Sequence, residues 1–365
     1  MSTTPRSLDA LGYVRFMLAL AVAAFHLWTP AFPDAGRHSV AGFFCISGFL
    51  VTLIANKAYK DRPAAFIGNR ILRLYPTYLV CLAIAYVICR IFPVPPLSPP
   101  VTIPMPVVLS DWFKQFSLIS SLNFAMGPMG GRILTTAWSL EVEIVFYAVI
   151  GLCTYRSVFL TVLGFVTSLT VALLGLYQVV PVQFYWSAMG TGFFFFGGSL
   201  AYFAGQKLEL GRAAWPLSAL ALLVFCSSTF GLPWTSELAD YATARPHLYL
   251  LISGGAMVAL LAALSSIKEP VMHMPGAAFL GRMAYPIFLL HKCIAVPVVE
   301  QIGVSNPFAI FALSMPFTLA ASALVIYAVE LPLETLRQRV RAGRKSSPAT
   351  DATIALPPAP ARRAA

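Results

Sequence analysis

Apolar stretches of about 20 residues recur along most of the chain, and short polar segments separate them. As a helix, a stretch of about this length crosses the roughly 30 Å hydrocarbon core of a bilayer. The pattern predicts ten transmembrane helices, near residues 10–28, 40–56, 74–92, 137–154, 157–177, 184–204, 213–231, 247–265, 278–299 and 307–329. The stretches lack an alternation of period two and are too long for barrel strands. The predicted fold class is therefore an all-α, polytopic integral membrane protein.

The composition excludes an ordinary soluble enzyme. Of the 365 residues, 58% are hydrophobic and 11% are charged, whereas soluble domains carry about a quarter charged residues. The net charge of +11 does not indicate a nucleic-acid partner, because no basic run is interleaved with aromatic residues on a polar face. The six cysteines lie in apolar stretches without CxxC spacing, so we expect no metal site and no disulfide framework.

The distribution of basic residues predicts the orientation. Ten spans place both termini on one side, where the connections and tail hold seventeen Lys and Arg residues against four on the other side. The positive-inside rule then assigns both termini to the cytoplasm. Residues 93–136, with seven prolines between Pro93 and Pro106, are predicted to form a long external loop. We expect one membrane domain over residues 1–335 and a basic, disordered cytoplasmic tail over residues 336–365.

Two ionisable residues of the first span are catalytic candidates. Arg15 and His26 are eleven residues apart, which at 100° per residue places them on one helix face about 16 Å apart. An ionisable group at membrane depth is costly unless it is paired or hydrated, which favours a functional role. The alternatives are that Arg15 reaches the headgroups and that His26 hydrogen bonds a neighbouring helix.

A second group of candidates could hold a donor molecule. Arg70 and Arg73 lie one helical turn apart where the third span begins, and Lys57 is close in sequence. Two guanidinium groups on one face can bind phosphates, but they can equally anchor the helix to lipid headgroups. Ser47 lies between the small residues Gly42 and Gly48, where either a ligand or a packed helix can approach closely.

The fourth span carries two carboxylates near its outer end. Glu141 and Glu143 are about 200° apart around the helix, so only one of them is expected to point inward. An inward carboxylate could orient His26 or accept a proton. A solvated carboxylate in the first turn would only interact favourably with the helix dipole. His291, in the ninth span, is a further candidate at a similar depth to His26, with a packing role favoured.

These motifs, in this order, resemble the membrane acyltransferase 3 family over about residues 8–335. Arg15 and His26 match an arginine followed after ten residues by a histidine, and Gly42 to Gly48 match GFFxxSG. Arg70 and Arg73 match RxxR. The segment from Trp138 to Glu143 matches WSLxxE, and YPIFLLH and VELPLE resemble late helices of the family. The chain departs from the family where LDALGY stands in place of LDGLRG, and it has no large domain after the last span.

The resemblance implies an O-acyltransferase of the bacterial cytoplasmic membrane. Its donor would be acyl-CoA, most commonly acetyl-CoA, and its acceptor a hydroxyl of a glycan, a lipid-linked saccharide or a small molecule. Arg15 and His26 would belong to the transfer site, Glu143 would support it, and Arg70 and Arg73 would lie in the donor region, together with Lys57 and Ser47. His26 could act as a general base or as a covalent acyl carrier.

Two other functions also fit the sequence pattern. A transporter or channel could use the path formed by Arg15 and His26. The other large family of membrane O-acyltransferases also uses a histidine in an apolar helix, and in that case His291 would be the better candidate.

Overall fold

The computed structural model describes residues 6–28, 34–92, 103, 105–118, 132–185, 187–230, 246–267 and 274–342. Its helices are α1 (Ala10–Leu27), α2 (Ala35–Ala58), α3 (Pro63–Ile91), α4 (Leu109–Ser117), α5 (Trp138–Val149), α6 (Val158–Leu176), α7 (Ala188–Lys207), α8 (Ala214–Phe230), α10 (Pro246–Ser266), α11 (Ala277–Ile302), α12 (Pro307–Val325) and α13 (Leu331–Ala342). Short π-helical segments, Ile150–Thr154 and Ile326–Glu330, continue α5 and α12.

The all-α membrane fold is confirmed. Nine helical stretches within the described residues are long and apolar enough to cross a bilayer. The sixth predicted span, residues 184–204, corresponds to α7, a 20-residue helix that stands outside this set. Five glycines and a polar end lower the mean hydropathy of α7, and neighbouring helices bury most of it.

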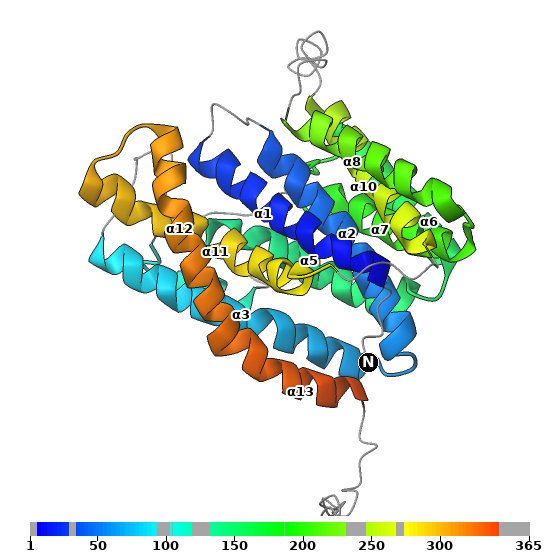
Figure 1. Cartoon of the computed structure of the whole chain (residues 1–365), viewed down its shortest axis with the longest axis horizontal. Helices are drawn as coiled ribbons and strands as arrows, with labels where there is room; N and C mark the ends of the chain where they lie inside the picture. The colour runs from blue at the N-terminus through cyan, green and yellow to red at the C-terminus, as the bar shows by residue number, and fades with distance from the viewer. Residues whose placement is uncertain are drawn as a thin grey trace, which may run out of the picture.

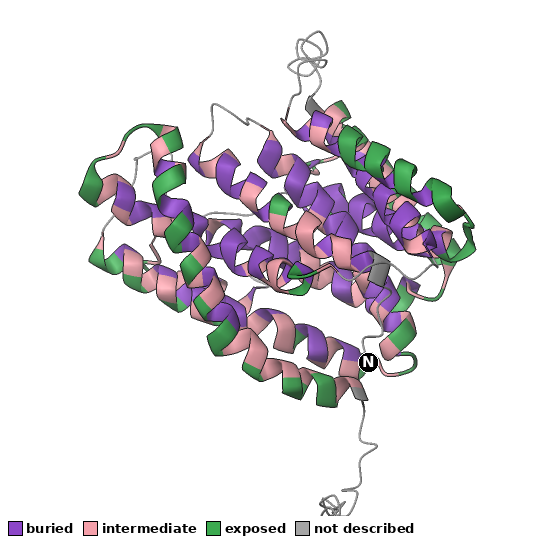
Figure 2. Cartoon of the chain, viewed as in Figure 1, coloured by how far each residue is buried: buried purple, intermediate pink, exposed green. Residues whose placement is uncertain are grey.

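The helices divide into a buried centre and an exposed periphery. Figure 1 shows α1, α2, α5 and α11 in the middle, with α6, α8 and α10 on one side and α3 and α13 along the opposite edge. Burial is greatest in the middle, and exposed positions gather on the outer helices (Figure 2). Exposed Phe159, Leu163 and Val166 of α6 are apolar, as expected for a helix that faces lipid rather than water.

Helices α2 and α7 pack with their backbones in close contact. A Cβ atom on Gly48 would lie 1.9 Å from the carbonyl oxygen of Phe195, and one on Gly198 would lie 1.9 Å from that of Cys45. Thr52 Oγ1 donates a hydrogen bond to Ser199 Oγ at 2.8 Å across the same interface. Small residues allow this approach, which is a common way for membrane helices to associate. Gly48 therefore has the packing role, and Ser47 faces another way.

Replacing Gly48 with alanine is expected to destabilise the protein. The added methyl group must push the two backbones apart, and overpacking of this kind costs roughly 1–3 kcal/mol. Gly255→Ala is the matched control, because no atom lies within 4 Å of a Cβ built there. Thermal unfolding of the detergent-purified proteins should show a lower midpoint only for Gly48→Ala. Equal midpoints would mean that the α2–α7 contact is looser than described.

The segment predicted as a long external loop, residues 93–136, contains a helix. The proline-free stretch after Pro106 forms α4, and Asp111 accepts hydrogen bonds from the backbone N–H groups of Val107 and Val108 at 3.2 and 3.4 Å. These bonds lower the pKa of the Asp111 carboxyl group. The prediction averaged proline and glycine over the whole segment and so missed this amphipathic helix of nine residues. Residues 93–102 and 119–131 lie outside the described residues.

The predicted tail also begins later than expected. Residues 336–342 belong to α13, where good helix formers such as Leu336 continue the helix past residue 335. Asn69 Nδ2 donates to the carbonyl oxygen of Arg337 at 3.0 Å, and the Arg62 guanidinium donates to that of Arg341 at 2.7 Å. These bonds fix α13 against the start of α3. The rest of the predicted tail, residues 343–365, lies outside the described residues.

Candidate active site

A polar cavity lies among α1, α2, α3, α5 and α11, inside the membrane-spanning part of the chain. It consists of two adjoining voids of about 320 and 60 Å³, which share Arg15, Arg73, Glu143, Tyr147 and Tyr285 in their lining. We call the two voids together the inner cavity. The larger void extends to Arg282, Glu330 and Arg337, near α13, and the smaller one contacts Ser47 and Arg70.

Five arginines and four carboxylates line the inner cavity, and three of the arginines are the candidates that the sequence indicated. Arg15 comes from α1, and Arg70 and Arg73 come from successive turns of α3. Arg70 is 5% exposed and its Cζ lies 5.5 and 5.6 Å from the ring centroids of Phe66 and Tyr147, while its Nε has no hydrogen-bond partner. In the part of the chain that the structure describes, none of the three arginines forms an ion pair. Guanidinium groups at this depth require nearby negative charge, which the lining carboxylates supply in part. The guanidinium donors that are not ion-paired remain suited to a negatively charged ligand.

Glu143 is the carboxylate that faces the inner cavity. Its Oε1 accepts a hydrogen bond from Ser47 Oγ at 2.6 Å and a second one from the hydroxyl of Tyr147, one turn further along α5. Glu143 and Glu330 are electrostatic neighbours of Arg73 but are not ion-paired with it. The cavity therefore contains carboxylates that position hydroxyl groups and leave the arginines accessible to a ligand.

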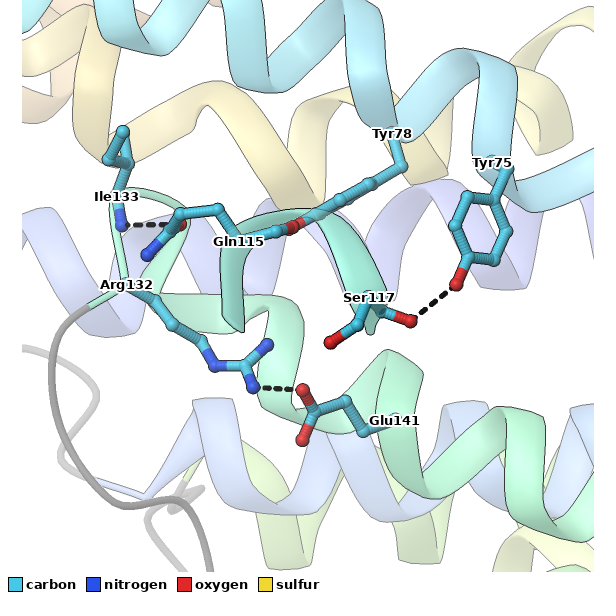
Figure 3. Close-up of polar contacts among 7 residues, drawn as sticks. All are labelled: Tyr75, Tyr78, Gln115, Ser117, Arg132, Ile133 and Glu141. Atoms are coloured by element: carbon cyan, nitrogen blue, oxygen red, sulfur yellow. Dashed lines mark hydrogen bonds and ion pairs between the residues drawn. The ribbon is translucent and has the colours of Figure 1, made fainter. Parts of the chain in front are cut away.

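Glu141 faces the opposite side of α5 and has a structural partner. Its carboxylate forms a buried ion pair with Arg132, just before α5 (Figure 3). Beside this pair, the side-chain Oε1 of Gln115 in α4 accepts a hydrogen bond from the backbone N–H of Ile133 at 3.1 Å. The Tyr78 hydroxyl donates to the backbone carbonyl oxygen of Gln115 at 2.6 Å. These contacts attach α4 to α3 and to the start of α5. The opposite orientations expected for the two glutamates are thus observed, and Glu143 is the inward one.

His26 lies beside His291 instead of in the lining of the inner cavity. The two rings are stacked, with centroids 5.3 Å apart and planes inclined by 20°. His291 is fully buried, its Nδ1 lies 3.0 Å from the carbonyl oxygen of Ile287, and its Nε2 has no partner. The sequence alone favoured a packing role for His291 and did not indicate this contact.

A pair of aromatic rings lies between the inner cavity and the histidines. Phe43 and Phe288 both line the smaller void, with ring centroids 5.9 Å apart, and Phe288 precedes His291 by one turn of α11. Arg15 lines the cavity and His26 is three turns further along the same helix. The shared face of α1 therefore leads from the cavity, past these two rings, to the histidine pair.

Lys57 does not join the other donor-binding candidates. It is exposed near the end of α2 and is absent from the described lining of the inner cavity. Its proximity to Arg70 in sequence does not bring it to the cavity, because a short turn separates the two helices and α3 packs against α11 and α13. By contrast, Arg15, Ser47, Arg70, Arg73 and Glu143 all line the inner cavity.

Several lining residues had no predicted role. Tyr147 could have been found from its spacing, since it lies one helical turn after Glu143. Tyr285 lies in the YPIFLLH motif, and Glu330 and Glu334 lie in VELPLE, so both motifs turn out to line the cavity. Arg282 and Arg337 lacked any motif, and only the packing of α11 and α13 reveals their position.

Comparison with known proteins gives the family. The family described as an acyltransferase domain, acyltransferase 3, matches residues 8–327. The chain is 27% identical over 311 residues to an exopolysaccharide production protein, ExoZ, of Rhizobium meliloti (strain 1021), covering 79% of this chain and 86% of the relative. No solved structure shows significant similarity to the chain. The match extends from the start of α1 to the π-helical segment after α12 and includes most of the lining of the inner cavity. The protein is therefore an integral membrane member of the acyltransferase 3 family.

Proposed function

We propose that this protein transfers an acyl group, most commonly acetyl, from acyl-CoA in the cytoplasm to a hydroxyl group of a saccharide acceptor. The observation that carries the donor assignment is the set of three arginines in the inner cavity without a carboxylate ion pair: Arg15, Arg70 and Arg73. CoA carries several negative charges on its phosphates, and guanidinium groups bind phosphate through paired hydrogen bonds.

The saccharide acceptor is supported by the relative. Its name associates it with exopolysaccharide production, and the similarity extends over most of both chains. The site also suits an acceptor that arrives from the other side of the membrane, because His26 lies near the end of α1 and far from the larger void. Donor and acceptor would then enter from opposite faces.

The transfer chemistry is assigned to His26. The acceptor oxygen attacks the thioester carbonyl carbon, the carbon–sulfur bond breaks, and CoA leaves as the thiolate. His26 either takes the hydroxyl proton as a general base or first accepts the acyl group on its ring. For the thioester to reach His26, the acyl arm must pass Phe43 and Phe288. Arg15 and the hydrogen-bonded Glu143 would hold the donor end of the path.

Release of free CoA thiol tests the proposal directly. We expect the purified protein in lipid nanodiscs to release CoA from acetyl-CoA, and we expect saccharides to increase the rate. Arg73→Gln should abolish most of this release, because it removes a cation from the inner cavity. Arg156→Gln is the control, since Arg156 is an exposed arginine paired with Asp61 at 2.6 Å. A transporter would move substrate without releasing thiol, and that result would contradict the proposal.

The orientation is tested by labelling with an impermeant thiol reagent. Among the described residues Cys153 is the exposed cysteine, so the experiment uses a Cys153→Ser background. Lys60→Cys, between α2 and α3, should be protected in intact cells, and Ser110→Cys, in α4, should react. Both should react in opened membranes. Equal labelling of the two in intact cells would invert or invalidate the assignment of the donor side.

A further inference from the structure

A second large cavity lies at the end of the molecule opposite the arginines. It has a volume of about 680 Å³ and is formed by Asp34, Arg37 and His38 at the start of α2, by most of residues 175–185 after α6, and by His247 and Leu250 of α10. We call it the outer cavity. Its lining has no residue in common with the inner cavity.

The charged side chains of the outer cavity are two, and they neutralise each other. Arg37 forms an ion pair with Asp34 at 3.5 Å. The remaining polar side chains of the lining are the imidazoles of His38 and His247, the amides of Gln178 and Gln183, and the hydroxyl of Tyr185. Such groups donate and accept hydrogen bonds without adding net charge. The cavity therefore suits a neutral ligand with many hydroxyl groups better than a phosphate.

One buried group in this lining lacks a partner. His38 is 2% exposed and its Nδ1 has no hydrogen bond, while the backbone of Ser228 interacts with the ring. Leaving a buried polar atom unpaired costs free energy, which a ligand hydroxyl would recover once the His38 ring turns toward the cavity that it lines. Phe184 adds an aromatic surface held by edge-to-face contact with His247, with ring centroids 5.0 Å apart. Aromatic surface with a few placed polar groups is the usual composition of a ligand pocket.

The outer cavity and His26 lie on opposite sides of the start of α2. Gly36 packs against Phe25, because a Cβ atom there would come within 2.3 Å of the Phe25 ring. The Phe25 ring in turn contacts His26, with centroids 4.9 Å apart. A sugar unit bound in the outer cavity therefore does not place its own hydroxyl at His26.

An aromatic partition separates the outer cavity from the inner one. Tyr185 lines the outer cavity and contacts Trp138, with ring centroids 5.5 Å apart. Trp138 contacts Phe44, at 6.2 Å between centroids, and Phe44 lines the inner cavity. A chain of three rings thus keeps the outer cavity apart from the donor site.

We propose that the outer cavity binds a non-reacting sugar unit of an oligosaccharide or polysaccharide acceptor. This inference rests on the proposed acyl transfer and specifies its substrate class. An acceptor of several units would occupy the outer cavity with one unit and present a hydroxyl of another to His26. A monosaccharide cannot occupy both places. The outer cavity would thus select for acceptor length.

The test compares acceptors of different length. The probes are methyl glycosides of glucose, galactose and N-acetylglucosamine and their corresponding hexasaccharides, each with acetyl-CoA and the purified full-length protein. We expect at least one hexasaccharide to have a lower KM than its methyl glycoside. Asp34→Asn and His247→Gln should each raise that KM roughly tenfold, since the first weakens a charge-assisted hydrogen bond to the bound sugar and the second displaces the hydrogen-bonding atoms of the ring. Neither variant should change turnover of the methyl glycoside or acetyl-CoA hydrolysis.

Asp61→Asn is the matched control, because it breaks an exposed ion pair at the other end of the molecule. If Asp34→Asn does not purify as a single species, His247→Gln carries the same expectation. The inference is overturned if no hexasaccharide has a lower KM than its methyl glycoside, or if neither variant changes the KM for the hexasaccharide. It is also overturned if the variants weaken the binding of acetyl-CoA instead. Absence of CoA release from the wild-type protein with any acceptor would overturn the proposed function itself.

Discussion

Replacing His26 with alanine is expected to lower the rate of acyl transfer at least about a hundredfold. Removal of a general base typically costs two to four orders of magnitude, and loss of a covalent carrier would cost no less. His26 lies on the face of α1 that begins in the inner cavity at Arg15. The variant should still bind CoA, because the inner cavity does not include His26. The measurement is CoA release with a saccharide acceptor, together with calorimetric binding of CoA.

His291→Ala is the matched comparison, because both histidines belong to the same stacked pair. On sequence alone His291 is expected to be dispensable, but the structure places its ring against His26. A packed aromatic pair contributes about 0.5–1.5 kcal/mol, so we expect a rate loss of roughly two- to tenfold. A folded His26→Ala protein with near-normal activity would refute the assignment of His26. A greater loss in His291→Ala would make His291 the reacting group.

Hydropathy predicted the helices whose sequences are uniformly apolar. It failed for helices whose sequences mix apolar and polar residues. Strongly apolar runs such as Val158–Leu176 predict their helices from the sequence alone, because burial in lipid requires only length and hydropathy. Helices α4 and α13 were missed because they lie at the edges of the membrane region. Their stability comes from hydrogen bonds such as that between Asn69 and Arg337, which no local pattern encodes.

The lining of the candidate site was more predictable than its geometry. Ionisable residues at membrane depth are rare, so Arg15, Arg70, Arg73 and Glu143 stood out, and Ser47 was indicated by the glycines beside it. All five line one cavity. Contacts between distant segments could not be predicted in this way. The stacking of His26 on His291 depends on how α1 packs along α11. Gly12 and Gly281 allow the backbones of these two helices to come into close contact.

Arg73 distinguishes donor binding from the other role considered for this pair, anchoring to lipid headgroups. Both roles use the positive charge, so a charge-removing substitution alone cannot separate them. Arg70 is unsuitable for the test because it is buried against Phe66 and Tyr147. Arg73 is only partly buried and lines both voids of the inner cavity. A conservative change at Arg73 therefore tests the ligand with little disturbance of packing.

Arg73→Lys is expected to weaken CoA binding about 10- to 100-fold while expression and insertion stay normal. Lysine keeps the charge that attracts headgroups, worth about 1 kcal/mol, but it lacks the planar fork that binds phosphate through two hydrogen bonds. A hydrogen bond to a charged group contributes about 1.5–3 kcal/mol, and about 1.4 kcal/mol corresponds to tenfold in affinity. Calorimetry with CoA measures the change, and Arg156→Lys, outside the cavity, should bind CoA as the unchanged protein does. If Arg73→Lys keeps full affinity, Arg73 does not hold the phosphates of CoA, and the donor site must be sought elsewhere on the protein.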